Sequence, residues 1–291
     1  MILFSVTASA QSFNIEPGDK AALLMVHFGS TYEDARRESI DAINAKAATE
    51  FDGMDVVEAY TSRMVIKRLK KRGIDKLTPI EALLRLAADG YTHVLVQSTN
   101  VIDGIEAENL RNEVASMNRF FKDVRVGRPL LYSVDDCRKV VDILVSRHSD
   151  ALGRKSHVVF VGHGTETPAN AIYSQIDYML SDAGHPECHV ATIEGYPDFD
   201  SLIARLRKDG ARQVCLVPFM FVAGDHARND IDNEWRKRLE ENGLKVTTVM
   251  EGLGSISEIQ NIFIDHTRDA MNSRPLSATQ IKSEFLKNNA D

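Results

Sequence analysis

The segment DGYTHVLVQSTNVIDGIEAEN (residues 89–109) matches the segment DGARQVCLVPFMFVAGDHARN (residues 209–229) along its whole length without a gap. Each begins with Asp-Gly, continues through an apolar run, and reaches a second glycine fourteen residues after the first. A further pair, LLMVHFGSTY (residues 23–32) and VVFVGHGTET (residues 158–167), aligns on its last glycine. A shared register through apolar run and loop favours an internal duplication, and the long period indicates two related domains rather than a solenoid.

Short apolar runs alternate with longer segments of helical period. The runs predicted as strands are residues 21–29, 55–61, 93–99 and 124–130, then 157–164, 189–195, 213–222 and 245–252. Apolar residues recur at helical spacing in residues 32–50, 80–88, 106–121 and 199–208. This alternation predicts an α/β fold with parallel sheets flanked by helices and right-handed crossovers. Two such domains facing each other would enclose a cleft.

The predicted domain limits are residues 19–150 for the N-terminal α/β domain and 151–270 for the C-terminal one. Residues 271–291 form a tail that is polar at first and then weakly helical. Residues 1–18 contain a short apolar run followed by Ala8-Ser9-Ala10, which resembles a signal-peptidase site, although no positive region precedes it. This pattern favours a periplasmic protein with a remnant of a signal peptide. The alternative is a frayed N-terminus of a cytoplasmic protein.

Composition excludes several classes of partner. The 291 residues carry a formal net charge of -7, whereas nucleic acids and anionic membranes require a basic face. Nothing approaches the ~20 consecutive apolar residues of a membrane span. The three cysteines, Cys137, Cys188 and Cys215, are too few and too scattered for a disulfide framework or a zinc cluster.

Nucleotide binding is a weak alternative. GHGTETP (residues 162–168) and HFGSTYED (residues 27–34) are glycine turns leading into helices, which is the usual setting for a bound anion. The chain lacks both G-x-G-x-x-G and G-x-x-x-x-G-K-[ST], so we expect no nucleotide cofactor. The G-x-S-x-G motif of a nucleophile elbow is also absent.

The differences between the two repeats identify candidate functional residues. His163 stands where the first repeat has Phe28, and His226 stands where the first repeat has Glu106. His163, His226 and Glu106 therefore follow the carboxyl ends of predicted strands, which is the edge where α/β sheets bind ligands. Two imidazoles and a carboxylate suit a divalent ion of the Co, Ni, Fe or Zn group, and they also suit general-base chemistry.

Each of these residues also has a structural interpretation. A histidine between glycines is more often structural than catalytic, His226 could form a surface ion pair, and Glu106 could complement a helix dipole. The coincidence of all three at strand ends favours a shared site. Glu194, at another strand end, is a further polar candidate. His157 and His93 begin strands and are predicted at the opposite edge.

Four motifs together resemble the anaerobic (class II) sirohydrochlorin cobalt chelatase family, and the resemblance extends from about Ala21 to His266. They are QSTNVIDGIEAENL (residues 97–110), GHGTETPANAIYSQIDYML (residues 162–180), TIEGYP (residues 192–197) and PFMFVAGDHARNDI (residues 218–231). Members insert Co(II) into sirohydrochlorin during cobalamin synthesis. The resemblance implies two Rossmann-like domains around a tetrapyrrole cleft. It also implies that His163 and His226 bind the metal and accept protons, with Glu106 as their acidic partner.

The expected substrates are a sirohydrochlorin-like tetrapyrrole and Co(II), with Fe(II) or Ni(II) as alternative metals. The residues expected to bind the tetrapyrrole are Phe28, Gly29, Ser30, Gly164, Thr165 and Met220, with Arg63 and Arg228 as candidates for its carboxylates. Some periplasmic members bind haem through a histidine where this chain has Asn100, which argues against haem here. The alternative functions are a periplasmic tetrapyrrole- or metal-binding protein without turnover, and a ferrochelatase-like enzyme. The sequence leaves open whether the protein forms a homo-oligomer.

Overall fold

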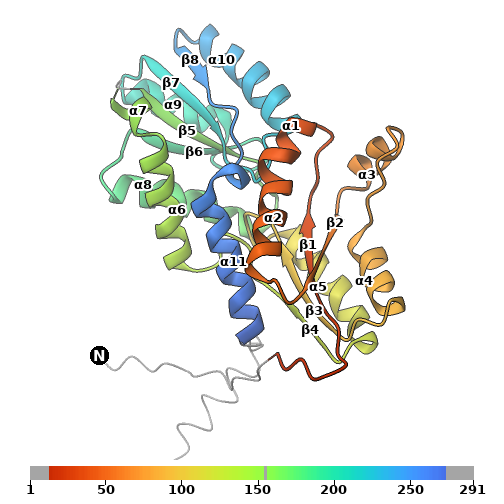
Figure 1. Cartoon of the computed structure of the whole chain (residues 1–291). Helices are drawn as coiled ribbons and strands as arrows, with labels where there is room; N and C mark the ends of the chain where they lie inside the picture. Colours follow the sequence, from red (N-terminus) through yellow and green to blue (C-terminus); the bar gives the residue numbers. More distant parts are fainter. Residues whose placement is uncertain (1–12, 154–155, 273–291) are drawn as a thin grey trace, which may run out of the picture.

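The chain forms two parallel four-stranded sheets joined by helices, as the computed structural model shows for residues 13–153 and 156–272 (Figure 1). The first sheet contains β1 (Ala21–His27), β2 (Asp55–Tyr60), β3 (His93–Ser98) and β4 (Asp123–Val126); the second contains β5 (His157–Gly162), β6 (Cys188–Thr192), β7 (Gln213–Pro218) and β8 (Lys245–Thr248). Their orders, β2-β1-β3-β4 and β6-β5-β7-β8, are the same. The predicted α/β fold with two parallel sheets is therefore confirmed, and the equivalent strands of the two repeats occupy equivalent positions in their own sheets.

Helices connect the strands and cover both sheets. In the first half they are α1 (Glu33–Ala35), the π-helix η1 (Arg36–Asp41), α2 (Ala42–Glu50), α3 (Arg63–Lys70), α4 (Pro79–Ala88), α5 (Ile105–Met117) and η2 (Asn118–Phe120). The link between the halves contains α6 (Val134–Arg147) and α7 (Ser149–Gly153). The second half contains η3 (Pro168–Asn170), α8 (Ala171–Asp182), α9 (Phe199–Lys208), the π-helix η4 (Ala227–Trp235), α10 (Arg236–Glu241), η5 (Leu253–Ser255) and α11 (Ser257–Asn272).

Alternate residues of the central strands enter different cores. In β1, Leu23 and Met25 join a central core that also includes Val158 and Phe160 of β5. Leu24 faces the other way, into a core beneath α4 and α5. A third core lies beneath α9 and η4 on the outer face of the second sheet. Because side chains alternate along a strand, each sheet is covered on both faces, and one continuous core joins the two halves.

Local sequence signals fix where the helices begin. Thr78 and Glu81 form a capping box at the start of α4, with Pro79 in its first turn. Ser133 and Asp136 form the same box at the start of α6. These caps satisfy backbone N–H groups that an α-helix leaves unpaired at its N-terminus.

The last helix, α11, returns to the first sheet, where it lies beside α2 and α6 (Figure 1). The Thr267 hydroxyl donates a hydrogen bond to Gln97 Oε1 of β3 at 3.1 Å, and Arg125 of β4 donates to the Met271 carbonyl at 2.9 Å. The two sheets fall on either side of the expected boundary near residue 150. Residues 257–270, however, were expected in the C-terminal domain and pack on the N-terminal sheet, because their apolar face completes the central core.

Residues 1–12, 154–155 and 273–291 lie outside the described residues. The signal-like segment around Ala8-Ser9-Ala10 and most of the expected C-terminal tail fall there, so both stay predictions. Within the described part of the chain, every helix is too short or too polar to cross a bilayer. Cys137, Cys188 and Cys215 are all buried.

Candidate metal centre between the two halves

His163 is held at the carboxyl end of β5 by a turn that requires glycine. Gly164 has a φ of +85°, and a Cβ atom at this position would overlap the carbonyl oxygen of Glu194. The backbone N–H of Glu194 in turn donates a hydrogen bond to the His163 carbonyl at 2.7 Å. The tight pairing of the two loops therefore fixes the backbone that carries the imidazole.

The structure brings His163 and His226 together. Their ring centroids are 4.7 Å apart and the rings are nearly perpendicular, at 85°. His226 lies at the start of η4, in the loop that follows β7, and β5 and β7 are hydrogen-bonded neighbours. The carboxyl ends of adjacent parallel strands meet at one edge, which explains the encounter. The side chains are 45% and 41% exposed, so both imidazoles can be reached from solvent.

Neighbouring oxygen atoms orient both imidazoles. His226 Nδ1 lies 2.6 Å from Asp230 Oδ2, one turn further along η4. His163 Nδ1 lies 3.1 Å from the Gly164 carbonyl and 4.0 Å from Glu194 Oε2. An acceptor at Nδ1 favours the tautomer with a proton there, so Nε2 of each ring keeps a lone pair for an ion. Asp230 was not singled out from the sequence, although its spacing of four residues from His226 on a helix was a usable signal.

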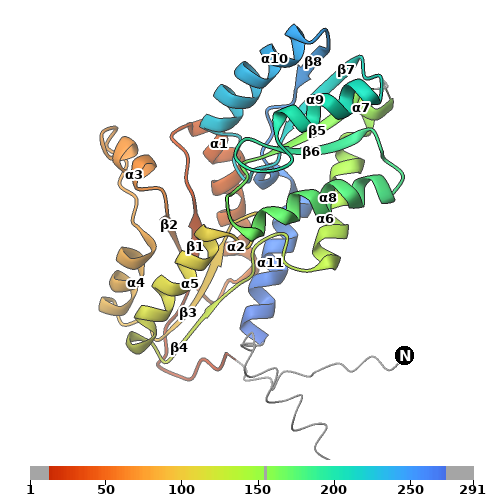
Figure 2. The same ribbon diagram turned by 180° about the vertical axis from the view of Figure 1, so that it is seen from behind.

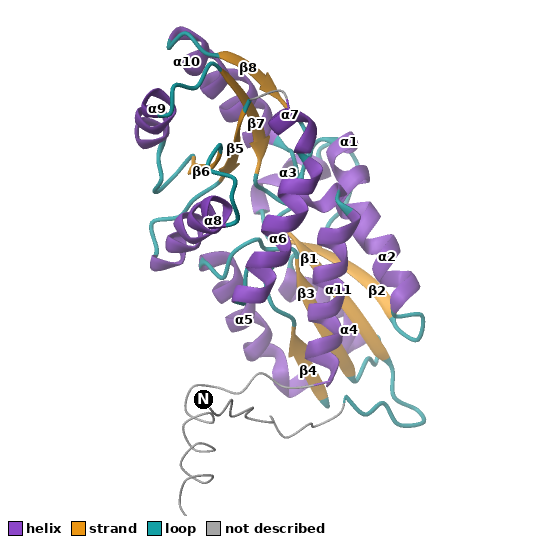
Figure 3. Ribbon diagram, turned by 90° about the vertical axis from the view of Figure 1, so that its left-hand side faces the viewer, coloured by secondary structure: helices purple, strands orange, loops and turns teal. Residues whose placement is uncertain are grey.

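Glu106, the third expected member, does not contact the histidine pair. It is exposed in the first turn of α5, beyond the end of β3. Within residues 13–153 and 156–272, a single group of three or more His, Cys, Asp or Glu has ligand atoms that all lie within 4.8 Å of one another. That group lies elsewhere and does not include Glu106. Gly104 nevertheless approaches Ala169 of η3, so the loop before α5 reaches the other half (Figure 3). The role of Glu106 stays a prediction, whereas Glu194 has a carboxylate oxygen 4.0 Å from His163 Nδ1.

The residues expected to bind the tetrapyrrole line the loops around this edge. Phe28 is 51% exposed, directly after β1, and Gly29 has a φ of +95° with the Tyr60 ring against it. Ser30 is buried, and its hydroxyl accepts a hydrogen bond from the Tyr32 N–H at 3.2 Å. Met220 and Thr165 are both partly buried. Their contacts with a substrate stay predictions.

An interdomain contact holds the segment that carries His226. The Tyr32 hydroxyl donates a hydrogen bond to Asp225 Oδ1 at 3.0 Å. The Arg228 guanidinium lies 4.4 Å from the centroid of the Tyr32 ring and pairs with Asp34 at 2.5 Å. Arg228 also holds the pKa of the Asp34 carboxyl below its usual value through this hydrogen bond. The sequence suggested Arg228 as a partner for substrate carboxylates; the structure shows it engaged with Asp34.

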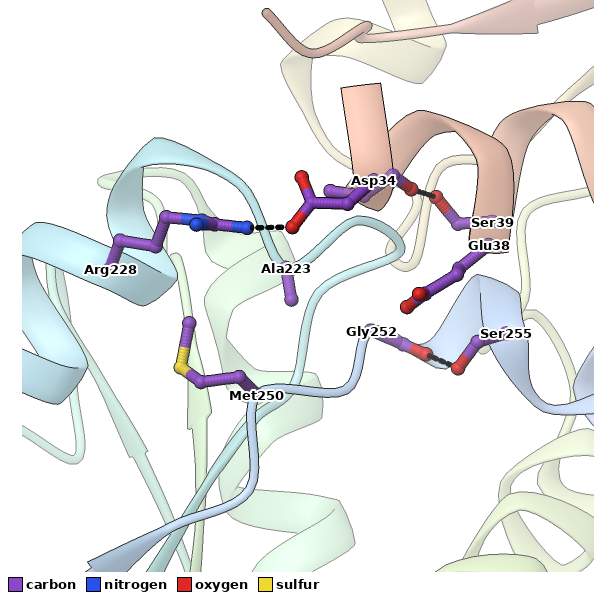
Figure 4. A pocket seen from close by; sticks show the side chains of 9 residues that line it. Asp34, Glu38, Ser39, Ala223, Arg228, Met250, Gly252 and Ser255 are labelled. Carbon is purple, nitrogen blue, oxygen red and sulfur yellow. Dashed lines mark hydrogen bonds and ion pairs between the residues drawn. The ribbon is translucent and has the colours of Figure 1, made fainter. Parts of the chain in front are cut away.

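A pocket lies beside this contact, between η1 and the segment that follows β8 (Figure 4). Asp34 and Arg228 form one side of it, and the rest is lined by Ala35, Glu38, Ser39, Ala223, Met250, Gly252 and Ser255. It encloses about 280 Å³, including space open to solvent. The hollow between the halves is therefore charged where α1 faces η4.

His27 is a buried structural histidine behind Phe28. Its Nδ1 lies 3.0 Å from the Thr99 hydroxyl and its Nε2 lies 3.0 Å from Asn44 Oδ1. The ring stacks on Phe221 of the second half, with centroids 6.0 Å apart. Burial lowers the pKa of His27 to about 4, so the imidazole is neutral at pH 7. It braces the first half against the loop that leads to His226.

Two curated relatives match almost the whole chain. The sirohydrochlorin cobaltochelatase of Salmonella typhimurium is 37% identical over 258 residues, which cover 87% of this chain and 97% of the relative. A second relative, the sirohydrochlorin cobaltochelatase CbiKC of Nitratidesulfovibrio vulgaris, is 30% identical over 265 residues, covering 88% and 93%.

Similarity to a solved structure supports the fold. SirB from Bacillus subtilis with Fe3+ superimposes with a TM-score of 0.64 at 17% identity, covering 87% of this chain and 96% of SirB. The family model described as cobalt chelatase (CbiK) matches residues 21–272, which include both sheets and the paired histidines. The chain belongs to the cobalt chelatase (CbiK) family.

Proposed function

We propose that this protein inserts Co(II) into sirohydrochlorin, and that His163 and His226 hold the incoming metal. The observation that carries the proposal is the pair of exposed imidazoles, 4.7 Å apart, at the end of two neighbouring strands. Membership of the cobalt chelatase family and relatives named sirohydrochlorin cobaltochelatase support the choice of reaction.

The two imidazoles suit a metal that must be released again. Nitrogen ligands of this kind bind Co(II), Fe(II) and Ni(II), and two protein ligands leave coordination positions open for exchange. A closed cysteine site would retain the ion. The contacts of Nδ1 with Asp230 and with the Gly164 carbonyl occupy that nitrogen of each ring and leave Nε2 available for the ion.

Insertion also requires that two pyrrole N–H protons leave the macrocycle. A neutral imidazole is a common general base and can accept a proton. We propose His163 and His226 for this step, because Nε2 of each ring is free to accept a proton once the metal has passed to the macrocycle, with Glu194 or Glu106 receiving the proton afterwards. The exposed Phe28 ring and the partly buried Met220 offer apolar surface for the macrocycle.

The test is an insertion assay with purified protein, sirohydrochlorin and Co(II), followed by absorbance. We expect His163→Ala and His226→Ala each to lower the rate by at least about 100-fold, the range of one acid–base or ligand group. His185→Ala is the matched control, because His185 lies on the α8–β6 connection away from the pair. Normal rates in both variants would refute the assignment.

Further arms of the same assay address the remaining alternatives. Glu106→Gln and Glu194→Gln identify which carboxylate assists. Offering Fe(II) and Ni(II) in turn ranks the metals. Binding of tetrapyrrole in a one-to-one ratio without turnover would instead indicate a binding protein, and turnover with protoporphyrin would indicate a ferrochelatase. The mass of the mature N-terminus tests the proposed periplasmic location.

A further inference from the structure

We propose that His157, His189 and Asp209 form a second divalent transition-metal site, separate from the paired histidines. One ligand atom from each of the three lies within 4.8 Å of the other two. His157 begins β5, whereas His163 follows its end, and six residues of strand span about 20 Å. An ion bound here therefore cannot contact His163 or His226.

Three elements deliver these side chains to one place. His189 is opposite Val159 in the β5–β6 register, so His157, two residues before Val159, projects from the same face of the sheet. Helix α9 covers this face of the second sheet (Figure 2). Asp209 is the C-cap residue that directly follows α9. The cluster thus lies where two strands begin and the covering helix ends.

The imidazoles already have the spacing that a shared ion requires. His157 Nδ1 and His189 Nε2 are 2.9 Å apart. Two nitrogens bound at about 2.1 Å from one ion and at right angles are separated by about 3.0 Å. The rings are parallel within 2°, with centroids 5.2 Å apart, which fits a single N–H···N hydrogen bond. An ion would replace that proton, and the partly exposed His157 ring would turn to direct its lone pair at the ion.

The charges around the cluster also favour a cation. The carboxylate of Asp209 lies at the negative end of the α9 dipole, where an anion is unfavourable unless a cation is near. No side chain in the described ranges forms an ion pair or hydrogen bond with this carboxylate. Arg205, in the last turn of α9, pairs with Asp177 at 2.8 Å. His189 is fully buried, and its Nδ1 has no hydrogen-bond partner among the described residues.

The ligand set indicates the class of metal. Two imidazoles and one carboxylate suit Zn(II), Co(II) and Ni(II), whereas Mg(II) and Ca(II) prefer oxygen ligands alone. With three protein ligands, at least one coordination position stays open to water. The site joins β5, β6 and α9, so the bound ion would stabilise the second sheet.

The experiment measures Co(II) binding to the full chain by calorimetry and by its visible absorption, without tetrapyrrole. The starting protein is the double variant His163→Ala/His226→Ala, which removes the first pair. We expect one Co(II) per chain to remain bound. Adding Asp209→Asn, which changes an exposed side chain, should weaken this binding at least about tenfold, as should His157→Gln.

His185→Gln is the matched control, because His185 lies at the same end of β6 outside the cluster, and it should leave binding unchanged. Thermal unfolding gives a second readout: Co(II) should raise the Tm of the double variant and not that of the variant with Asp209→Asn. Absence of Co(II) binding by the double variant would overturn the proposal. Binding that is equal with and without Asp209→Asn and His157→Gln would also overturn it. Neither result depends on metal insertion, so the proposal stands or falls independently of the proposed function.

Discussion

Acidification should destabilise the protein through His27, and His27→Gln should remove that part of the pH dependence. The imidazole is buried between Thr99 and Asn44 and stacks on Phe221. Burial penalises the imidazolium and lowers the pKa of His27 to about 4 in the folded protein, against about 6.5 in an unfolded chain. A glutamine fills similar space, offers hydrogen bonds, and does not titrate.

The sign and size of the effect follow from linkage. Between pH 6.5 and pH 4 the unfolded state binds this proton and the folded state does not, so stability falls as the pH falls through that window. Above pH 7 the imidazole is neutral in both states and contributes no pH dependence. With these two pKa values, lowering the pH from 7 to 5 reduces the free energy of unfolding by about 2 kcal/mol, and lowering it from 7 to 4 reduces it by about 3 kcal/mol.

The assay is urea unfolding of the wild type and of His27→Gln at pH 7, 6 and 5. Other buried histidines, such as His189, have lowered pKa values and destabilise both proteins in acid, so their effect cancels in the difference. The free energy of unfolding of the wild type should fall by about 2 kcal/mol more than that of the variant between pH 7 and pH 5. A difference that is constant with pH would refute the reasoning, because it would mean that His27 titrates alike in both states.

Two further substitutions test the geometry of the metal centre. Gly164→Ala should lower the free energy of unfolding by at least about 2 kcal/mol more than Gly184→Ala does. Both glycines have a positive φ, but only at Gly164 would a Cβ atom overlap a neighbour. Equal losses of stability in thermal unfolding would contradict this. Asp230→Asn should weaken Co(II) binding at the paired histidines by about 10- to 100-fold with little change in Tm, because Nδ1 of His226 loses its charged partner. Asp232→Asn, in the same π-helix, is the control, and calorimetry showing equal affinities would count against an orienting role.

The sequence predicted the strands and the paired histidines through one signal, the repeat. Aligning Gly29 with Gly164 and Glu106 with His226 placed His163 and His226 after strands that prove to be neighbours. Equal strand order in the two sheets followed from the same match. A strand-and-loop pattern that occurs twice in one chain is a reliable predictor, because the second copy checks the interpretation of the first.

Contacts between segments far apart in the sequence were harder to predict. Helix α11 has ordinary helical period, and nothing in that period tells which sheet its apolar face will cover. Glu106 matches His226 in the repeat, yet equivalent positions in two separate sheets need not meet. The engagement of Arg228 with Asp34 joins residues almost two hundred positions apart. Such contacts depend on how the two halves are set against each other, which the repeat does not encode.

The return of α11 to the first sheet has a consequence for synthesis on the ribosome. The N-terminal sheet ends at Val126, but the helix that covers part of its inner face ends at Asn272. The whole segment from β4 to the end of α11 must therefore emerge before the first half can close its core. We expect the core of the nascent first half to remain open until α11 has been synthesised, because Gln97 and Arg125 bond to Thr267 and Met271 of that helix.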